Sequence, residues 1–503
     1  MADDLALAPR ALTDAVGTSN GPVRGYREDG LSVFKGVRYG APPTGLARFK
    51  PPARPAPWSE PLETTQYGAP AIQSGLAPGE RRTSPGDPPA PDEPASSEDC
   101  LFLNVWTPGL DRARRPVMVW LHGGGFANGS GGAAMYDGGA LARKGDVVTV
   151  TVNHRLNVFG YLHLGEAFGP EYAKSGVAGM IDIVQALEWV RDNIEAFGGD
   201  PGDVTIFGES GGGWKVSLLL AMPSARGLFH KAIIQSGPGL TAKPKADAAE
   251  VARQLLAELG VSTPEALAAL STETISHASV KLPGEAMRLY TPVRDGEVIP
   301  RDPFEPDASP LNADVPLLIG TNKDENTLFL FSHPRFGAFT EDDIAKQAKG
   351  VAGERADELV AALRRAYPDY SETHIYSAIG TVSGMWGNSV KLAERKAAQG
   401  AAPVFMYLLT WETPVAKGRL RSPHAIEIPL VFDNVEKARN FVGRGDEPQR
   451  LADQMSSAWL AFARTGDPGW PAYDARGRAT KIFDLESRVE RDPLSEIRKV
   501  LHG

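Results

Sequence analysis

The stretch that decides the fold of this chain is Val204-Thr205-Ile206-Phe207-Gly208-Glu209-Ser210-Gly211-Gly212. Its first half is β-branched and apolar, as in a buried strand, and a later apolar run at 216–222 stops at Pro223, as a short buried helix would. A serine with glycines two positions before and after it is typical of a sharp strand-to-helix turn that presents the hydroxyl to a base. The pattern therefore predicts a strand, a turn and a helix, with Ser210 as a candidate nucleophile.

A second match to Gly-x-Ser-x-Gly, at Gly17-Thr18-Ser19-Asn20-Gly21, shows how little the pentapeptide proves by itself. The chain has 54 glycines among 503 residues, so chance matches are expected. No strand-like apolar run precedes Ser19, and the sequence after it does not begin a helix. We interpret this copy as an N-terminal turn, so it is the flanking sequence that singles out Ser210.

Size and composition exclude several classes of protein. A chain of 503 residues, 42% of them hydrophobic, can bury a large core. The net charge of −9 and the lack of a long basic run argue against nucleic acid as a partner. No apolar run approaches the length of a membrane span, and the first residues lack the basic start and apolar stretch of a secretion signal. Because Cys100 is the single cysteine, no intrachain disulfide can form, and we expect a soluble cytoplasmic protein.

Short β-branched segments bounded by turn residues alternate with helical patterns along the chain. The helical patterns include 181–197 and 248–259, each followed by glycine. This alternation predicts an α/β fold with a mostly parallel central sheet and helices on both of its faces. The expected strands are 117–121, 147–152, 204–207, 232–234, 316–319 and 404–409.

Three segments are expected to interrupt this alternation. Residues 69–97 are crowded with Pro, Gly and Ser and contain no aromatic residue, which favours a long loop or a lid. Residues 237–310 are mainly helical in pattern, alanine-rich and amphipathic, and a second helical stretch lies within 335–400. We interpret all three as insertions in one domain spanning 1–503, forming a lid over the active site.

Three consecutive glycines follow the expected strand 117–121, in His122-Gly123-Gly124-Gly125-Phe126. Glycines leave backbone N–H groups unshielded, so a substrate carbonyl can approach them, and such donors stabilise a developing oxyanion. A phosphate-binding loop or a plain flexible turn is the alternative, but neither Gly-x-Gly-x-x-Gly nor a P-loop lysine pattern is present here. We therefore expect this loop to supply oxyanion donors.

A serine nucleophile needs a histidine base and an acid that orients the base. With the serine at a strand-to-helix elbow, the expected chain order is serine, acid, histidine. That order and the positions of the other histidines favour His424, one of nine, although a lone histidine is more often structural. The acid is expected just after the strand 316–319, at Asp324 or Glu325; the pattern does not choose between them, and a solvated charged turn is the alternative. His-Glu-x-x-His is absent, and we expect no metal site.

Further motifs stand in one order along nearly the whole chain, around the loop at 122–126 and the elbow. They are Phe34-Lys35-Gly36-Val37-Arg38-Tyr39, Ala41-Pro42-Pro43-Thr44-Gly45, Ser97-Glu98-Asp99-Cys100-Leu101-Phe102-Leu103-Asn104-Val105, Phe197-Gly198-Gly199-Asp200-Pro201, Glu427-Ile428-Pro429 and Trp459-Leu460-Ala461-Phe462-Ala463-Arg464-Thr465-Gly466-Asp467-Pro468. With these motifs the chain resembles the type B carboxylesterases, which are α/β-hydrolases that include bacterial para-nitrobenzyl esterases and animal cholinesterases.

The resemblance implies an α/β-hydrolase fold and a role for each candidate, position by position. Ser210 would be the nucleophile, Glu325 the acid and His424 the base. The implied oxyanion donors are the N–H groups of Gly124, Gly125 and Gly211.

The implied reaction is the hydrolysis of an uncharged carboxylic ester to acid and alcohol, through an acyl-enzyme on Ser210 and without a cofactor or metal. The partner would be a small-molecule ester, and nothing in the sequence indicates an oligomeric state. An amidase or carbamate hydrolase with the same triad is the near alternative, because only the leaving group differs. A non-catalytic adhesion or scaffold protein on the same fold is the remote one, and the retained serine, acid and histidine argue against it.

Departures from the family pattern cluster beside the serine. Gly211 stands where alanine is usual, and Trp214 and Lys215 stand where small residues are usual; we expect Trp214 to pack beneath the pocket rather than to shape it. Ala71 cannot pair with Cys100, so no disulfide staples the 69–97 loop. The candidate pocket residues are Phe126, Glu209, Trp214, Phe329 and Trp386, of which the aromatic ones could equally be core.

Overall fold

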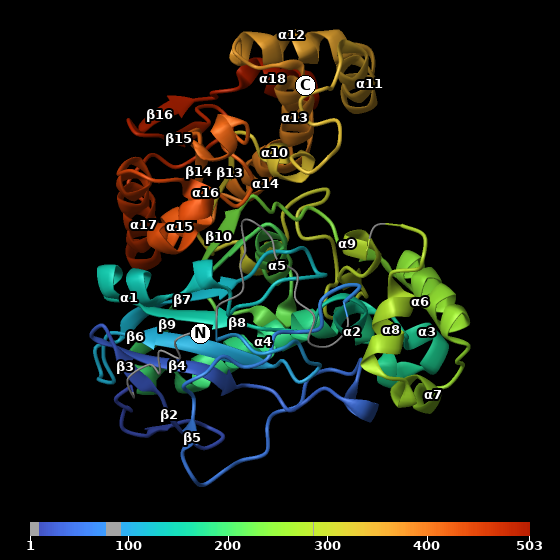
Figure 1. Ribbon diagram of the computed structural model, residues 1–503, viewed down its shortest axis with the longest axis vertical. Coiled ribbons are helices and arrows are strands. Elements are labelled where there is room, and N and C mark those ends of the chain that lie inside the picture. Colours follow the sequence, from blue (N-terminus) through green and yellow to red (C-terminus); the bar gives the residue numbers. More distant parts are fainter. Residues whose placement is uncertain (1–9, 77–91, 285) are drawn as a thin grey trace, which may run out of the picture.

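A computed structural model describes residues 10–76, 92–284 and 286–503. In this part of the chain, eleven strands form one sheet (Figure 1). Their order is β16 (Arg488–Arg491), β15 (Ala479–Phe483), β14 (Val404–Leu409), β13 (Leu317–Asn322), β10 (Lys231–Gln235), β9 (Gly199–Glu209), β7 (Arg115–Leu121), β8 (Val148–Val152), β6 (Phe102–Thr107), β4 (Leu31–Arg38) and β3 (Tyr26–Glu28). The strands from β15 to β8 pair in parallel, and the strands at both edges join antiparallel. The predicted α/β architecture is confirmed.

Side chains of the central strands point alternately to the two faces of the sheet and so belong to two buried cores. Val119 and Ile206 pack on one face, whereas Trp120 and Phe207 pack on the other. The first core includes side chains of α4 (Ala178–Asn193), α5 (Gly211–Leu219) and α14 (Gly387–Ala398). The second includes side chains of α1 (Gly139–Gly145), α15 (Ile428–Val431) and α17 (Glu447–Thr465). Helices therefore cover both faces, as predicted.

The six expected strands correspond to β7, β8, β9, β10, β13 and β14. The expected helix 181–197 is α4 followed by a 3-10 turn at Ile194–Phe197, and 248–259 lies in α6 (Lys245–Leu259). Among the helices of the described residues, none is both long and apolar enough to cross a membrane.

Ser19, the serine of the second Gly-x-Ser-x-Gly match, lies in a turn. It falls between β1 (Val16–Gly17) and β2 (Pro22–Arg24), which pair antiparallel, and β5 (Leu62–Glu63) joins them in a separate small sheet. The prediction of an N-terminal turn is confirmed.

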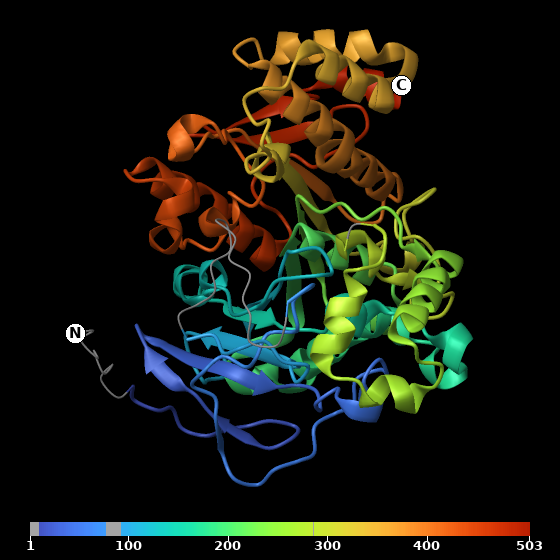
Figure 2. The same cartoon turned by 45° about the vertical axis from the view of Figure 1, so that its right-hand side comes forward.

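Two of the expected insertions are mainly helical. Residues 237–310 form α6, α7 (Pro264–Ala269), α8 (Thr272–Ser279) and α9 (Ala286–Leu289), with β11 (Lys243–Pro244) paired to β12 (Val293–Arg294). Both views place α11 (Glu341–Ala352), α12 (Ala356–Ala366) and α13 (Glu372–Thr381) at one end of the molecule, beside α18 (Ser495–His502) (Figures 1 and 2). The rest of 335–400 includes α14, which packs against β13 and β14. The remaining α-helices of the described residues are α2 (Asn157–Tyr161), α3 (Gly165–Phe168), α10 (Asn326–Leu330) and α16 (Arg439–Val442). The role of these insertions as a lid stays a prediction.

Most of the expected 69–97 loop, residues 77–91, lies outside the described residues. Its two ends are joined by a 2.9 Å hydrogen bond from the Ser97 amide to the Pro70 carbonyl. The Gly129 amide donates to Gln73 Oε1 at 2.7 Å, and Ser130 Oγ donates to the Glu93 carboxylate. Both ends of the segment are therefore bound to the chain that follows the glycine loop.

Candidate active site

Ser210 by itself makes the turn between β9 and α5. Its φ of 56° and ψ of −122° are values that non-glycine residues rarely adopt, so the backbone is strained here. Two hydrogen bonds hold it: the Ser210 amide donates to the Gln235 carbonyl at 2.8 Å, and the Trp214 amide donates to the Ser210 carbonyl at 3.0 Å. The strand, turn and helix predicted from the sequence are thus present, with the serine at the turn.

The glycines that flank the serine are required by close backbone contacts. A Cβ at Gly208 would lie 2.6 Å from the carbonyl carbon of Gly212. A Cβ at Gly212 would overlap the carbonyl oxygen of Leu121, at the end of β7. The motif therefore lets the elbow sit directly against the neighbouring strand.

Glu325 and His424 come together from two separate loops. His424 Nδ1 lies 2.6 Å from Glu325 Oε2, and both side chains are buried. The other carboxylate oxygen of Glu325 accepts hydrogen bonds from Ser236 Oγ at 2.5 Å and from the Asn322 amide at 2.7 Å. The acid that the resemblance assigned is thus the one that contacts the imidazole.

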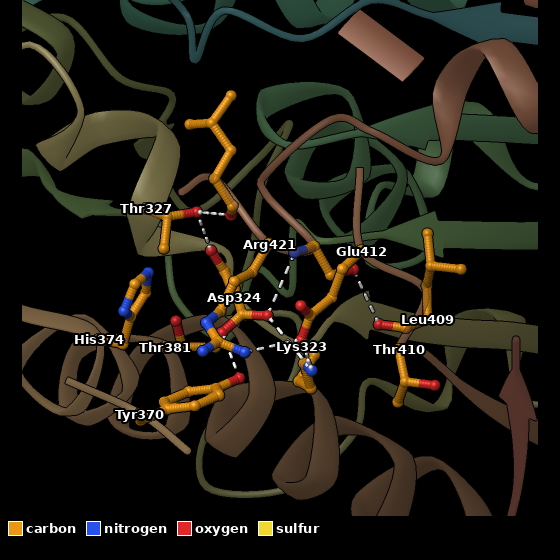
Figure 3. Close-up of polar contacts among 12 residues, drawn as sticks. Lys323, Asp324, Thr327, Tyr370, His374, Thr381, Leu409, Thr410, Glu412 and Arg421 are labelled. Atoms are coloured by element: carbon orange, nitrogen blue, oxygen red, sulfur yellow. Dashed lines mark hydrogen bonds and ion pairs between the residues drawn. The ribbon is translucent and has the colours of Figure 1, made fainter. Parts of the chain in front are cut away.

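Asp324, the alternative acid, has other partners (Figure 3). Tyr370 donates to its Oδ1 at 2.5 Å and the Ser422 amide to its Oδ2 at 3.2 Å, while the Asp324 amide donates to the Ser422 carbonyl at 2.9 Å. Burial raises the pKa of Asp324 to about 6, although Lys323 at 3.8 Å opposes this. Asp324 therefore fastens the loop two residues before His424 rather than contacting the imidazole.

A third group, Glu209, faces the other side of the imidazole. His424 Nε2 lies 3.0 Å from Glu209 Oε1. Burial lowers the pKa of His424, but the charges of Glu209 and Glu325 outweigh it and raise this pKa to about 9. Among the hydrogen bonds of the described residues, none joins Ser210 Oγ to His424. The sequence predicts Glu209 only as a pocket residue, and no sequence signal places it beside the imidazole.

Glu427 adds a further buried carboxylate behind Glu325. Burial raises its pKa to about 7, and the charge of Glu325 adds to the effect. Its oxygens accept from Asn322 Nδ2 at 2.6 Å and from Gln235 Nε2 at 3.3 Å. Gln235 in turn accepts from Trp459 Nε1 at 3.0 Å, so the acid loop is braced against α17.

No group of three or more His, Cys, Asp or Glu side chains in the described residues could hold a metal ion.

The glycine loop after β7 lies against the start of α5. Gly124 and Gly125 have φ values of 81° and 63°, which glycine adopts readily. A Cβ at Gly211 would overlap the carbonyl oxygen and Cα of Gly125. The structure thus brings the three predicted oxyanion-donor residues together beside Ser210.

The model of the carboxylesterase family matches residues 13–491 of the chain. The chain belongs to the carboxylesterase family. It is 37% identical to a para-nitrobenzyl esterase of Bacillus subtilis (strain 168), over 97% of this chain and 98% of the relative. It is 33% identical to a phenmedipham hydrolase of Pseudarthrobacter oxydans, over 94% of this chain and 96% of the relative. The crystal structure of a Geobacillus stearothermophilus carboxylesterase superposes with a TM-score of 0.85 at 38% identity, covering 97% of this chain and 100% of that one.

The predictions of the α/β-hydrolase fold and of a serine carboxylesterase are confirmed by these relatives. The protein is an enzyme that hydrolyses carboxylic esters, and the amidase alternative is not favoured.

The predicted pocket residues of the carboxylesterase separate into two groups. The Phe329 ring centre lies 4.9 Å from that of His424, and Phe329 is 51% exposed, so its ring borders the imidazole. Phe126 is fully buried and packs edge-to-face on Trp214 at 5.2 Å, and Trp214 Nε1 donates to the Thr241 carbonyl at 3.2 Å. Trp386 is buried in the core near α14. Phe126 and Trp386 are thus buried in the core and Trp214 is partly buried against it, while the role of Trp214 at the pocket stays a prediction.

The position of Met287 beside the glycine loop of the carboxylesterase is not predicted by the sequence. It lies in α9, within the expected 237–310 insertion, and its side chain is exposed. A Cβ built on Gly125 would lie 2.9 Å from Met287 Cε, so this methyl group lies beside Gly125 of the glycine loop. No sequence motif marks it, because only the path of the insertion brings it there.

Proposed function

We propose that Ser210 is the nucleophile of this carboxylesterase, His424 its general base and Glu325 the acid that orients the base. The observation that carries the proposal is the 2.6 Å contact of Glu325 with His424, beside a serine held at a φ of 56°. The proposed oxyanion donors are the N–H groups of Gly124, Gly125 and Gly211.

Acylation begins when the Ser210 hydroxyl oxygen attacks the ester carbonyl carbon and its proton passes to Nε2 of His424. The tetrahedral oxyanion is stabilised by the backbone donors. His424 then gives the proton to the alkoxide as the carbon–oxygen bond breaks, and the alcohol leaves. Water attacks the acyl-enzyme in the same manner and releases the carboxylic acid and free Ser210.

Glu209 is proposed to control when the base is available. Its carboxylate at 3.0 Å favours the protonated imidazole, whereas accepting the serine proton requires the neutral one. The same carboxylate stabilises the imidazolium that forms as the serine attacks. Glu209 therefore makes the active fraction of the enzyme dependent on pH.

Uncharged, apolar esters are the substrates that the surroundings of Ser210 support. The exposed Phe329 ring lies beside the imidazole, and the Met287 methyl group lies beside Gly125 of the glycine loop. One relative is named for the para-nitrobenzyl group, which is aromatic and uncharged overall. A panel of p-nitrophenyl esters of increasing acyl length, with a matched p-nitroanilide, measures both the preference for chain length and the preference for ester over amide.

Covalent labelling tests the nucleophile. Treatment with a serine-directed fluorophosphonate, followed by intact-mass and peptide analysis, is expected to give one adduct, on Ser210. A Ser210→Ala variant should be inactive and unlabelled, and a Ser19→Ala variant should match the unaltered enzyme. An adduct on another residue, or hydrolysis by Ser210→Ala at the normal rate, would overturn the proposal.

We also propose that the enzyme works in the cytoplasm. Its single cysteine, Cys100, is buried and unbonded, which suits a reducing compartment. Fractionation of the native cells tests this, and recovery of the protein in the culture medium would contradict it.

A further inference from the structure

Lys215 is a fully buried lysine in the first turns of α5. Its Nζ donates hydrogen bonds to two carbonyl oxygens of the glycine loop, that of His122 at 3.0 Å and that of Gly125 at 2.8 Å. Nζ also lies 5.1 Å from the centre of the Phe126 ring, which is a favourable contact for a cation. One ammonium group thus contacts the loop at its start, at its last glycine and at the residue that follows.

The two carbonyl groups stand on either side of the proposed oxyanion donors. The N–H groups of Gly124 and Gly125 lie between the His122 and Gly125 carbonyls in the chain. A loop of three glycines has no side chains of its own to hold it, and glycine has the greatest backbone freedom of any residue. A donor contributes to catalysis only if it is already placed where the oxyanion forms. The loop therefore needs an external restraint, and Lys215 supplies one.

Gly211 and Lys215 act on the same carbonyl group. A Cβ at Gly211 would overlap the oxygen of Gly125, the atom to which Lys215 donates. The two residues are four apart on α5, so they share one face of the helix. The two departures from the family pattern are therefore physically linked: glycine at 211 leaves room for the Gly125 carbonyl, and lysine at 215 binds it.

Burying this amine is costly, which argues that it is retained for a purpose. Burial lowers the pKa of Lys215 to about 7, and the Glu209 carboxylate acts in the opposite direction. The stacked imidazoles of His122 and His154 also face this region, 4.9 Å apart, and burial lowers the pKa of both. Both carbonyl oxygens can accept from either form of the amine.

We infer that Lys215 is a positioning residue for the oxyanion donors, fastening the glycine loop to α5, and that Gly211 is its structural complement. This inference rests on the proposed function, because it assumes that the acyl group is formed on Ser210 beside that loop. Lys215 donates to backbone carbonyls of the loop, so it acts through that backbone.

Lys215→Met tests the inference, with Lys396→Met as the matched control. Lys396 in α14 is also buried, and its Nζ likewise donates to two carbonyl oxygens, of Asn312 at 3.0 Å and of Ala313 at 2.7 Å, away from the site. Lys215→Met should lower kcat for p-nitrophenyl butyrate by about 10- to 100-fold with KM changed less than about threefold. Lys396→Met should keep kcat within about twofold, whatever its loss of thermal stability.

A trifluoromethyl ketone gives a readout that a merely structural role would not change. Ser210 adds to its carbonyl carbon, the serine proton passes to His424, and the resulting hemiketal oxyanion occupies the donor site. Its inhibition constant should rise in Lys215→Met by the same factor as kcat/KM falls, and Lys215→Arg should restore part of the affinity. An unchanged inhibition constant, or a loss equal to that of Lys396→Met, would overturn the inference.

A double-mutant cycle tests the link to Gly211, and the Gly211→Ala variant alone tests the placement of the Gly125 carbonyl if Lys215→Met does not fold. Gly211→Ala should also lower kcat, because its Cβ displaces the Gly125 carbonyl. The double variant Gly211→Ala/Lys215→Met should be no worse than the more impaired single variant, since both changes release the same group. Losses that multiply would contradict the link. If fluorophosphonate does not label Ser210, the proposed function fails; if it does and the ketone still binds Lys215→Met normally, only this inference fails.

Discussion

The Nε2 atom of His424 lies 3.0 Å from Oε1 of Glu209. With Glu325 on Nδ1, the imidazole lies between two carboxylates in a buried site. Such an arrangement favours the imidazolium, whereas the proposed base must be neutral to accept a proton. The geometry of the site thus makes catalysis depend on the ionisation of one histidine, which can be measured.

The first prediction concerns pH. Because the pKa of His424 is raised to about 9 and only the deprotonated ring can act as base, kcat/KM should rise with pH toward that value. Glu209→Gln removes one of the raising charges, so the rising limb should move to lower pH. Initial rates with p-nitrophenyl butyrate from pH 6 to 10, corrected for spontaneous hydrolysis, measure it. Glu436→Gln, which changes an exposed glutamate, is the control. If the rising limb of Glu209→Gln lies at the same pH as in the unaltered enzyme, the role of the Glu209 charge is refuted.

The second prediction separates two adjacent acids. Glu325→Gln should lower kcat by about 10²- to 10⁴-fold, because the amide cannot hold the imidazole in the right tautomer or stabilise its positive form. Asp324→Asn should lower kcat less than about tenfold, because Asp324 contacts Ser422 and Tyr370 rather than the imidazole. Steady-state rates on both variants, with thermal unfolding to check the fold, decide it. Equal losses would show that Asp324 does more than fasten the loop.

The third prediction concerns stability at Asp324. Tyr370→Phe removes the hydroxyl that donates to its carboxylate at 2.5 Å, and should cost about 1–3 kcal/mol of unfolding free energy. Burial raises the pKa of this carboxyl to about 6, so its ionisation disfavours the folded state as pH rises through that value. The Tyr370 hydroxyl stabilises the ionised form of Asp324. The deficit in unfolding free energy of the Tyr370→Phe variant should therefore be larger at pH 8 than at pH 5.

Urea unfolding at the two pH values measures this deficit. Tyr473→Phe is the control, because Tyr473 is also buried and its hydroxyl has no hydrogen-bond partner within the described part of the chain. A deficit that is the same at both pH values would mean that the hydroxyl does not act through the charge of Asp324.

Much of the site could be read from the sequence because its signals are local. The turn at Ser210 is predicted by the two flanking glycines, because so sharp a turn leaves no room for larger side chains. The glycine loop after β7 is predicted by its three consecutive glycines. The choice between Asp324 and Glu325 could not be read from the pattern, since two neighbouring carboxylates in a charged turn look alike until the backbone direction is known. The resemblance to the family made that choice.

The groups that sequence reasoning missed depend on contacts between distant segments. Glu209 reaches His424 across more than two hundred positions of the chain, and Met287 reaches Gly125 only because of the path of α9. The partners of Lys215 were hidden for the same reason, although its presence in a run of small residues was visible. Trp386 is the opposite case, because it is a candidate pocket residue in the sequence and lies in the core of the structure. An aromatic side chain in a helical pattern looks the same in the sequence whether it lines a pocket or packs in a core.

The last prediction uses two glycines in opposite settings. Gly212 lies in the first turn of α5, where a Cβ would overlap the Leu121 carbonyl oxygen, so Gly212→Ala should cost about 2–4 kcal/mol and most of the activity. Gly350 lies in α11 with open space around the position of its Cβ, so Gly350→Ala should stabilise the protein by about 0.5–1 kcal/mol and leave activity unchanged. Denaturant unfolding and initial rates on both variants measure the contrast. A stable, active Gly212→Ala enzyme would mean that the elbow can move away from β7, and the close contact that positions Ser210 would not be needed.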